Sequence, residues 1–399
     1  MSVRARPYRA DFAPMIIVRT FALACVVVSI LYYAATAIAA ERFARRAAKP
    51  PLSLPKIAPR VAVLKPLHGL TRSLPENLVS ILEAAYPRID YYFAVGSYED
   101  PAAPIPAALR ARYQFANLTL IVGDEPDCVN LKIAKLIRMA QRAEKADIFV
   151  MSDADIYVEQ DYLRRVVSEL VSDEKIGVVT CAYRAHPNHS VTSRMEALFV
   201  NTDFAPQVML SEMIEPMRHA LGATIAIKRA ALESIGGFRA VKDNLADDFY
   251  LGRMAADHGW KVMLSSALVT ISAEEDSFSH FWNHQLRWAR TYRMVRPVSM
   301  ATIVTHGPFW ALVLVLLSKA SIASLAALAT VIAARLAMSA FMLRRVLKLP
   351  ELKRDLWLVV VKDLLMTAIW FASFTSNKVL WGGRRLRVTR GGVMHEVKG

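Results

Sequence analysis

The chain has 399 residues, 54% of them hydrophobic, which leaves room for one catalytic domain of ordinary size together with membrane segments. Its 50 lysine and arginine residues exceed its 35 acidic residues and give a net charge of +15. These basic residues crowd beside the apolar runs and no aromatic-basic binding module is visible, so we expect an anionic membrane surface as a partner and no nucleic acid. The three cysteines lie far apart, which argues against a disulfide framework and a cysteine metal site.

The first predicted element is an apolar run over residues 15–40, interrupted only by Arg19. The run is longer than the ~20 residues that cross a hydrocarbon core. It is also too long for a secretion signal and lacks a cleavage site. We therefore expect residues 1–49 to form an uncleaved N-terminal membrane anchor, followed by a proline-rich linker over residues 49–59.

Residues 50–300 carry an α/β pattern, in which short apolar, β-rich runs alternate with helical stretches. This alternation predicts a mostly parallel, doubly wound sheet, and the ligands of such sheets collect at the carboxyl ends of the strands. The predicted strands cover residues 61–64, 91–95, 118–122, 148–151 and 176–180. Polar residues that follow these strands are therefore candidates for a site.

Two acidic clusters follow predicted strands. Asp100 comes after the second strand, and Asp153 and Asp155 come directly after the fourth. Two carboxylates at this spacing can turn toward one divalent ion and a diphosphate that it bridges, so we assign Asp153 and Asp155 as ligands of Mg²⁺ or Mn²⁺. The alternative is a solvated pair of acids at a strand end, which is a common pattern.

Asp247 and Asp248 follow a glycine turn and precede a predicted helix. A helix start is a rigid platform, so these carboxylates are candidates for a general base. The alternative is that both are helix N-terminal acids favoured by the helix dipole. Lys132 lies one helix before the strand that leads to Asp153 and is a candidate phosphate contact, with a solvated lysine as the alternative.

The segment that begins at His284 places Arg287, Arg290 and Arg293 along one edge of a predicted helix. Arg287 and Trp288 can clamp a diphosphate and cover an acceptor pocket, because a guanidinium grips phosphate oxygens in pairs. The alternative is an interfacial helix whose basic edge lies on anionic lipid.

Residues 301–399 form the predicted C-terminal membrane region with a basic tail. The stretch 308–343 is either one tilted helix or a hairpin of two, and 356–374 is a further span. Charges inside a span are costly, so we expect Lys362 and Asp363 to face the helix bundle or to lie near an interface. The basic tail is expected to lie on anionic lipid.

The motifs EDPA, NLK, SDAD, LADDFYLG and HQLRWAR follow one another between residues 61 and 297. Their order resembles that of the ceramide glucosyltransferase family and its hopanoid-associated relatives in bacteria. The resemblance implies a GT-A fold and inverting transfer of a sugar from a UDP donor to a membrane lipid. At His284 the sequence departs from the Gln or Arg of the family pattern, and this departure leaves the acceptor open.

The resemblance also implies roles for the candidate residues. Asp248 would take the proton of a lipid hydroxyl, and a partly apolar pocket and the neighbouring Asp247 would raise its pKa. Trp288 would pack against the sugar or the lipid mouth. The predicted catalytic residues are Asp248, Asp247, Arg287, Trp288 and His284, and the predicted contacts of the nucleotide sugar are Asp100, Lys132, Asp153 and Arg287.

The predicted reaction transfers glucose or N-acetylglucosamine to ceramide, with a hopanoid polyol or diacylglycerol as alternative acceptors. Nucleotide sugars are made in the cytosol, so we expect a bacterial inner-membrane protein whose catalytic domain is cytoplasmic. Three rivals remain open: a processive polysaccharide synthase, a polyprenyl-phosphate sugar transferase, and a transport or scaffold protein without catalysis.

Overall fold

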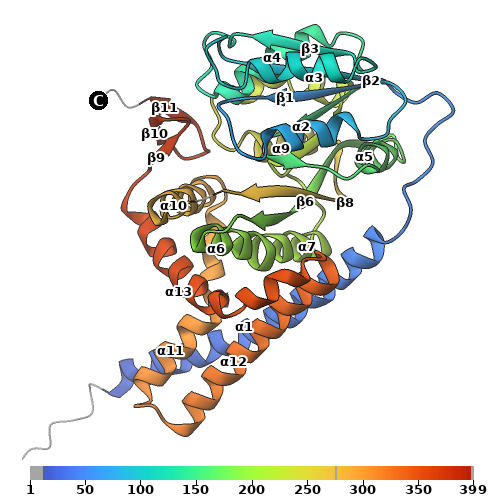
Figure 1. The fold of residues 1–399 in the computed structure, drawn as a ribbon. Coiled ribbons are helices and arrows are strands. Elements are labelled where there is room, and N and C mark those ends of the chain that lie inside the picture. The colour runs from blue at the N-terminus through green and yellow to red at the C-terminus, as the bar shows by residue number, and fades with distance from the viewer. Residues whose placement is uncertain (1–11, 275, 397–399) are drawn as a thin grey trace, which may run out of the picture.

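An eight-stranded sheet forms the centre of the α/β body in the computed structural model, which describes residues 12–274 and 276–396 (Figure 1). The strand order is β3-β2-β1-β4-β7-β6-β8-β5. The strands are β1 Val61–Pro66, β2 Ile89–Val95, β3 Leu118–Val122, β4 Ile148–Ser152, β5 Ile156–Tyr157, β6 Ile176–Pro187, β7 Thr224–Lys228 and β8 Lys261–Ala273.

The first half of the sheet is parallel, as predicted. Strand β1 pairs with β2 and with β4, and β2 pairs with β3, all in parallel. Every residue of β4 and all but the last of β1 are buried. Helices cover both faces of such strands, which is why they read as continuous apolar runs in the sequence.

The second half of the sheet is mixed and contains strands that the sequence analysis missed. Strand β7 is antiparallel to both β4 and β6, whereas β8 pairs in parallel with β6 and antiparallel with the short β5. Of strands β5 to β8, only β6 was predicted. The sheet as a whole stays mostly parallel, and β4 ends beside β7, where the chain turns toward the site described below.

The helices divide between the body and the membrane side. The body contains α2 Leu74–Leu82, α3 Pro104–Arg112, α4 Leu131–Arg142, α5 Tyr162–Leu170, α8 Arg229–Ser234, the 3₁₀ helix η2 Phe238–Val241 and α9 Asp247–Asp257. Under the sheet lie α6 Val191–Phe199, the π-helical η1 Val200–Phe204, α7 Ala205–Ile214 and α10 Phe278–Val295 (Figure 1). Helices α6, η1 and α7 run on without a break, so one long helix separates the sheet from the membrane side.

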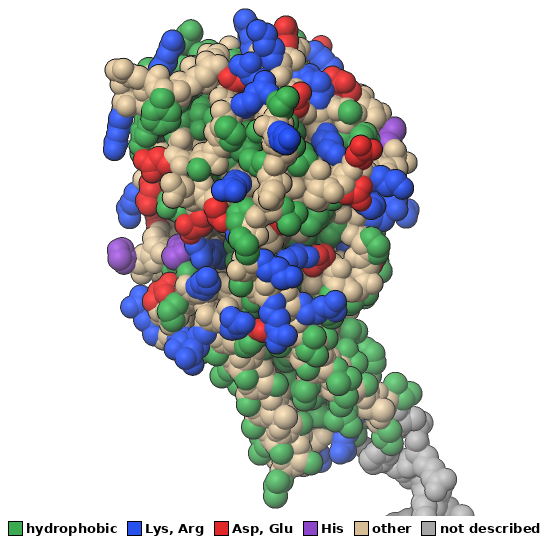
Figure 2. Space-filling model, turned by 90° about the vertical axis from the view of Figure 1, so that its right-hand side faces the viewer, with side chains coloured by type: hydrophobic (Ala, Val, Ile, Leu, Met, Phe, Trp, Pro, Cys, Tyr) green, Lys and Arg blue, Asp and Glu red, His purple; other side chains and the backbone are tan. Residues whose placement is uncertain are grey.

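A stalk of apolar helices projects from the body and consists of α1 Phe12–Ala47, α11 Gly307–Leu317 and α12 Ile322–Phe341 (Figure 1). Helix α1 is long and apolar enough to cross a membrane, as are the helices over 322–346 and 357–375. A fourth span results if η3 Pro297–Thr305 and α11, which are bent by 55°, count as one. Figure 2 shows hydrophobic side chains over the stalk, with Lys and Arg side chains gathered where it meets the body.

The stretch predicted as one tilted helix or a hairpin is a hairpin. Helices α11 and α12 are joined by a turn in which Lys319 and Ala320 have φ values of 48° and 53°. The side chain of Ser321 then caps α12 by accepting a hydrogen bond from the Ser324 backbone N–H. The chain continues through η4 Met342–Val346 and η5 Pro350–Asp355 into α13 Trp357–Ala372 and η6 Ser373–Thr375.

Two buried cations and two partly buried aspartates join the body to the membrane-side helices. Arg335 on α12 lies 2.8 Å from Asp203 on η1 and 2.8 Å from Asp363 on α13. Lys362 lies 2.6 Å from Asp363 and also pairs with Asp203. Lys362 and Asp363 therefore face the helix bundle, one of the two placements expected for charges in an apolar stretch. Two cations and two anions balance, so neither buried cation is left as an isolated charge.

Replacing Arg335 by methionine tests this ionic cluster. The Arg335→Met variant keeps the bulk of the side chain but leaves Asp203 and Asp363 with Lys362 alone. Breaking a buried pair from one side destabilises a protein by about 3–5 kcal/mol, so we expect a markedly lower unfolding temperature in detergent. Arg345→Met, which removes an exposed partner of Glu41, serves as the control and should change that temperature little. Equal unfolding temperatures for the two variants would contradict the structural role of the cluster.

Candidate active site

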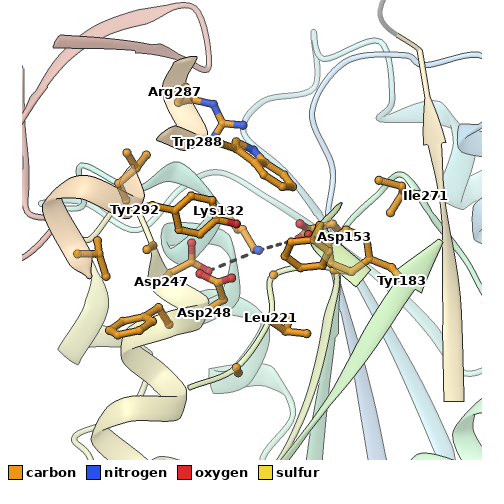
Figure 3. A pocket seen from close by; sticks show the side chains of 18 of the residues that line it. Lys132, Asp153, Tyr183, Leu221, Asp247, Asp248, Ile271, Arg287, Trp288 and Tyr292 are labelled. Atoms are coloured by element: carbon orange, nitrogen blue, oxygen red, sulfur yellow. Dashed lines mark ion pairs between the residues drawn. The ribbon is translucent and has the colours of Figure 1, made fainter. Parts of the chain in front are cut away.

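The carboxyl end of β4, the start of α9 and the inner side of α10 enclose a cavity of about 690 Å³ (Figure 3). Its walls include residues from the body, from η3 on the membrane side and from the segment after α13. Of the predicted site residues, Lys132, Asp153, Asp155, Asp247, Asp248, His284, Arg287 and Trp288 line it. The structure thus brings together residues that lie up to 156 positions apart, as 288 − 132 gives.

The turn that carries Asp153 and Asp155 is fixed by a buried lysine. Lys65, on β1, donates from Nζ to the carbonyl oxygens of Asp153 at 2.8 Å and Ile156 at 3.2 Å. Burial lowers the pKa of Lys65 to about 8, against the opposing effect of the two aspartates. The sequence analysis missed Lys65, because a lysine inside a strand carries no motif and gains its role only from the turn above it.

Both aspartates of this turn line the cavity, where the surrounding protein shields them in part and Asp155 is the more exposed of the two. Burial raises the pKa of Asp153 to about 6, although Lys132 acts in the opposite direction. Removal of water by the surrounding protein is also the largest cause that raises the pKa of Asp155, whose side chain lines the cavity. A cation brought between these two carboxylates would relieve the cost of holding them ionised.

Lys132 links the two acidic clusters (Figure 3). The Asn130 side chain caps α4 by accepting hydrogen bonds from the N–H groups of Lys132 and Ile133. From this first turn, Nζ of Lys132 lies 2.7 Å from Asp153 and 3.4 Å from Asp247. Burial would lower the pKa of Lys132, but the neighbouring carboxylates outweigh it and raise the pKa. The solvated lysine that was the alternative is therefore wrong.

Asp247 and Asp248 form the first turn of α9 and differ in their surroundings. Asp247 is buried and accepts a hydrogen bond from Asn130 at 3.3 Å. Asp248 lines the cavity, and a Cβ at Gly222 would lie 3.0 Å from its Oδ2, so the glycine makes room for it. Burial, and then the charge of Asp247, raises the pKa of Asp248 to about 7. Both causes are those expected from the sequence.

Helix α10 presents His284, Arg287 and Trp288 to the cavity from the opposite side (Figure 3). Nδ1 of His284 lies 3.3 Å from Oε1 of Glu196, a buried residue on α6 that also lines the cavity. Gln285 donates to the other carboxylate oxygen of Glu196 at 2.6 Å. Glu196 was missed, because a single glutamate in a predicted helix has no signal until α6 and α10 pack together.

Trp288 forms part of an aromatic wall. Its ring centroid lies 5.8 Å from that of Phe199, 5.9 Å from Phe204 and 5.5 Å from His284, in edge-on arrangements. Such edge-to-face contacts fix the orientation of the indole beyond what burial alone requires. Tyr292, on the next turn of α10, extends this wall toward Asp248 (Figure 3).

Asp100 stands apart from the other predicted residues. It is absent from the described residues that line the cavity, and its side chain is buried. Oδ1 accepts hydrogen bonds from the backbone N–H groups of Gly69 and Ala102, both at 2.9 Å. Oδ2 lies 3.3 Å from Nδ1 of His68, which does line the cavity. The structure thus places Asp100 behind the cavity wall, where it contacts the turn after β1 and His68.

The metal assignment rests on two carboxylates. Within residues 12–274 and 276–396 no group of three or more His, Cys, Asp or Glu side chains could hold a metal ion. Mg²⁺ in proteins is commonly held by one or two carboxylates together with substrate phosphates and water, and this description fits Asp153 and Asp155 beside an open cavity. A diphosphate would complete the ligand set that these oxygens begin.

Residues 21–394 match the family described as glycosyl transferase family 21. The chain belongs to glycosyltransferase family 21. Ceramide glucosyltransferase 3 of Caenorhabditis elegans is 25% identical to it over 232 residues, which are 58% of this chain and 50% of that protein. The probable glycosyltransferase YdaM of Bacillus subtilis is 22% identical over 244 residues, which are 59% and 56% of the two chains. This family 21 protein thus spans about half the length of the curated relatives it matches.

The mannosyltransferase PcManGT of Pyrobaculum calidifontis, solved with GDP-Man and Mn²⁺, aligns with 90% of this family 21 chain and 97% of its own. The TM-score is 0.51 at 21% identity, so the likeness concerns the fold. It confirms the predicted GT-A fold. Membership of family 21 and the similarity to ceramide glucosyltransferases confirm the family resemblance noted in the sequence.

The supporting role of Lys65 leads to a prediction about donor binding. Lys65→Met removes the donor of two buried carbonyl groups, and an unsatisfied buried group costs about 1–3 kcal/mol. The turn that holds Asp153 and Asp155 should loosen, so we expect weaker Mn²⁺-dependent binding of UDP in titration calorimetry. Lys56→Met, in the exposed linker before β1, is the control. Unchanged UDP binding in a folded Lys65→Met protein would show that the turn holds its shape without the lysine.

Proposed function

We propose that this family 21 protein is an inverting lipid glycosyltransferase, which transfers glucose or N-acetylglucosamine from a UDP-sugar to the hydroxyl group of a membrane lipid, with ceramide as the first candidate. One observation carries the proposal. The cavity that holds Asp248 and the Asp153 turn is also lined by Ser299, Met300 and Thr302 of η3. Because η3 with α11 is a candidate membrane span, a lipid hydroxyl can reach the acidic cluster from the membrane side.

The donor half of the proposal concerns the diphosphate. Asp153 and Asp155 would hold Mg²⁺ or Mn²⁺, which would neutralise the charge of the diphosphate as the leaving group departs. Lys132 keeps the acidic cluster from repelling a polyanion, since its ammonium already lies between Asp153 and Asp247. Arg287 would contact the diphosphate from α10, because a planar guanidinium matches pairs of phosphate oxygens.

The acceptor half depends on Asp248. As a carboxylate it would accept the proton of the lipid hydroxyl while that oxygen attacks the anomeric carbon from the face opposite the leaving group, which inverts the configuration in one step. A pKa of about 7 makes it a stronger base than an ordinary aspartate and still leaves much of it ionised at neutral pH. Asp247 is less suited to this role, because one of its carboxylate oxygens accepts a hydrogen bond from Asn130 and the other pairs with Lys132.

His284 and Trp288 would shape the acceptor side. Glu196 and the edge of Trp288 hold the imidazole in place, which supports a role in orienting the acceptor rather than in carrying charge to the donor. The family pattern has Gln or Arg at the position of His284. We infer that this difference changes the side chain that meets the acceptor. A hopanoid polyol or diacylglycerol remains the alternative acceptor.

The path of the chain supports a membrane arrangement. Helix α10 and the segment after α13 both contact the body, so the chain crosses the membrane an even number of times between them. The α11–α12 hairpin supplies two crossings, and α13 contacts α10 and α6, which fits a helix lying along the interface. We infer that the protein lies in a bacterial inner membrane with its body in the cytoplasm, where nucleotide sugars are made and where basic side chains meet anionic lipid.

The decisive experiment identifies the product. Purified protein in vesicles of anionic lipid would receive UDP-glucose or UDP-N-acetylglucosamine, with ceramide, diacylglycerol or a hopanoid polyol present in turn. Mass spectrometry should detect one added sugar on the lipid, and the NMR coupling of its anomeric proton should show a β-linkage if the donor is an α-linked UDP-sugar. A polymer, a polyprenyl-linked sugar or retention of configuration would overturn the proposal.

Asp248→Asn tests the base. General-base catalysis contributes on the order of 100-fold or more, so turnover should fall by at least that factor while UDP binding stays near the parental value. Because the ionised form is the base, kcat/KM of the parent should fall as the pH drops below about 7. Asp257→Asn, at the other end of α9, is the control and should keep parental turnover. Equal loss of UDP binding and turnover would indicate a structural role for Asp248.

Asp155→Asn tests the metal assignment. An amide is a weaker ligand than a carboxylate for a hard divalent cation, so the variant should need more Mn²⁺ for half-maximal UDP binding. Asp161→Asn is the matched control, because Asp161 follows Asp155 by six residues and does not line the cavity. A folded Asp155→Asn protein with unchanged Mn²⁺ dependence would remove Asp155 from the metal site.

A further inference from the structure

A small antiparallel sheet follows the last membrane-side helices and lies against the body beside α10 (Figure 1). Its strands are β9 Lys378–Trp381, β10 Arg384–Val388 and β11 Met394–Glu396, in the order β11-β10-β9. This is the basic tail that was expected to lie on anionic lipid. We call it the C-terminal sheet.

The C-terminal sheet binds the loop that leads into α9. The backbone N–H of Leu245 donates to the carbonyl oxygen of Gly392 at 2.9 Å, and that of Met394 donates to Asp243 at 2.8 Å. A β-bridge between Asn244 and Val393 lies between these two bonds. The loop is therefore held as if it were a further strand, two residues before Asp247.

The same sheet binds the segment that leads into α4. Arg384 donates from Nη2 to the carbonyl oxygen of Val129, and from Nη1 to Glu396 at 2.5 Å. Val129 immediately precedes Asn130, the cap of the helix that carries Lys132. A small hydrophobic core joins both attachments, with Leu245, Val379, Leu386, Val388 and Met394 buried and Val129, Met294 and Trp381 packed against them.

Helix α10 provides the third attachment. Nη1 of Arg290 donates to the carbonyl oxygen of Lys378 at 2.6 Å, and Nη2 of Arg293 donates to that of Ser376 at 3.1 Å. Two arginines of the basic edge that the alternative interpretation placed on anionic lipid thus bind the start of the C-terminal sheet. The C-terminal sheet therefore contacts three segments that lead to or carry predicted site residues. They are the segment before α4, the loop before α9 and helix α10.

The C-terminal sheet also reaches the cavity. Trp381, Gly382 and Arg384 line it together with Lys132, Asp247 and Asp248. The side chains of β10 alternate, with Arg384, Leu386 and Val388 toward the body and Arg385 and Arg387 exposed. The charges of this tail are therefore not equivalent, because one of them belongs to the cavity wall and its neighbours face away.

We propose that the C-terminal sheet is a cap of the active site, which closes the cavity over the sugar donor with Trp381 and positions Lys132 and the Asp247–Asp248 turn through Arg384 and the loop at 243–245. The inference rests on the proposed function only in taking the cavity as the site of a nucleoside diphosphate sugar. Arg384 is a positioning residue, since it acts through Val129, whereas Trp381 faces the cavity itself.

Two glycines of the C-terminal sheet allow a matched test. Gly392 and Gly383 have φ values of 76° and 73°, so alanine strains both to a similar extent. A Cβ at Gly392 would lie 2.9 Å from Val295 and 3.1 Å from Tyr250, whereas a Cβ at Gly383 meets nothing within 4 Å. Gly392→Ala should therefore push the sheet off the body, and Gly383→Ala should leave it docked.

Three measurements compare the two glycine variants: kcat/KM, UDP binding and hydrogen exchange, and the last two do not require catalysis. For Gly392→Ala we expect kcat/KM for UDP-sugar to fall roughly tenfold or more, since misplaced positioning groups can cost up to ~100-fold, with a rise in KM as the larger part. Binding of UDP with Mn²⁺ should weaken, and hydrogen exchange should speed up over residues 129–132 and 243–248. Gly383→Ala should match the parent in all three. Equal kcat/KM and UDP binding for the two variants would overturn the proposal.

Arg384→Ala, with Arg385→Ala as its control, repeats the test by a different route and remains informative if Gly392→Ala does not fold. Each variant removes one arginine from β10, so an effect through anionic lipid would be at least as large for the exposed Arg385. Weaker UDP binding and faster exchange at 129–132 for Arg384→Ala alone support the cap. Equal effects of the two changes overturn it. Absence of sugar transfer by the parent would count against the proposed function only, because UDP binding and exchange do not depend on transfer.

Discussion

One ammonium group, that of Lys132, lies between the carboxylates of Asp153 and Asp247, and the rest of the site depends on it. Without a cation there, the carboxylates of the β4 turn and of the start of α9 would repel each other across the cavity. The cap at Asn130 fixes the start of the helix that carries this ammonium, and Lys65 fixes the backbone of Asp153, whose carboxylate the ammonium meets. At Asp248, one residue further on, the effect of Lys132 is smaller than those of burial and of Asp247, so the pKa of Asp248 is raised.

The same principle recurs at the junction with the membrane. Arg335 and Lys362 neutralise Asp203 and Asp363, and Asp203 belongs to the π-helical turn whose next residue, Phe204, lines the cavity. A π turn shifts the side chains that follow it relative to a regular helix, and such turns are frequent at functional sites. One short segment therefore contributes both to the attachment of the membrane-side helices and to the aromatic wall around Trp288.

Much of the fold followed from local pattern, and the failures have physical reasons. Strands β1 to β4 were predicted because burial on both faces makes them continuous apolar runs. Strand β8 was missed because Ser265 and Ser266 interrupt its pattern, and they are buried only because Glu169, far away in sequence, binds their hydroxyl groups. The strands of the C-terminal sheet are short and rich in arginine, so a charge cluster concealed their alternation. Candidate residues next to strand or helix ends could be found, whereas Lys65 and Glu196 depend on contacts that no local pattern encodes.

The position of the C-terminal sheet in the chain has a consequence for biosynthesis. Its strands follow the α11–α12 hairpin, so the ribosome makes them after the membrane-side helices have entered the translocon. A nascent chain can thus insert into the bilayer while one wall of its cavity is still missing. The site would stay open until insertion is complete, and a nonsense mutation between α13 and β9 would yield an inserted protein that lacks this wall and leaves Leu245, Val129 and Met294 without their apolar cover.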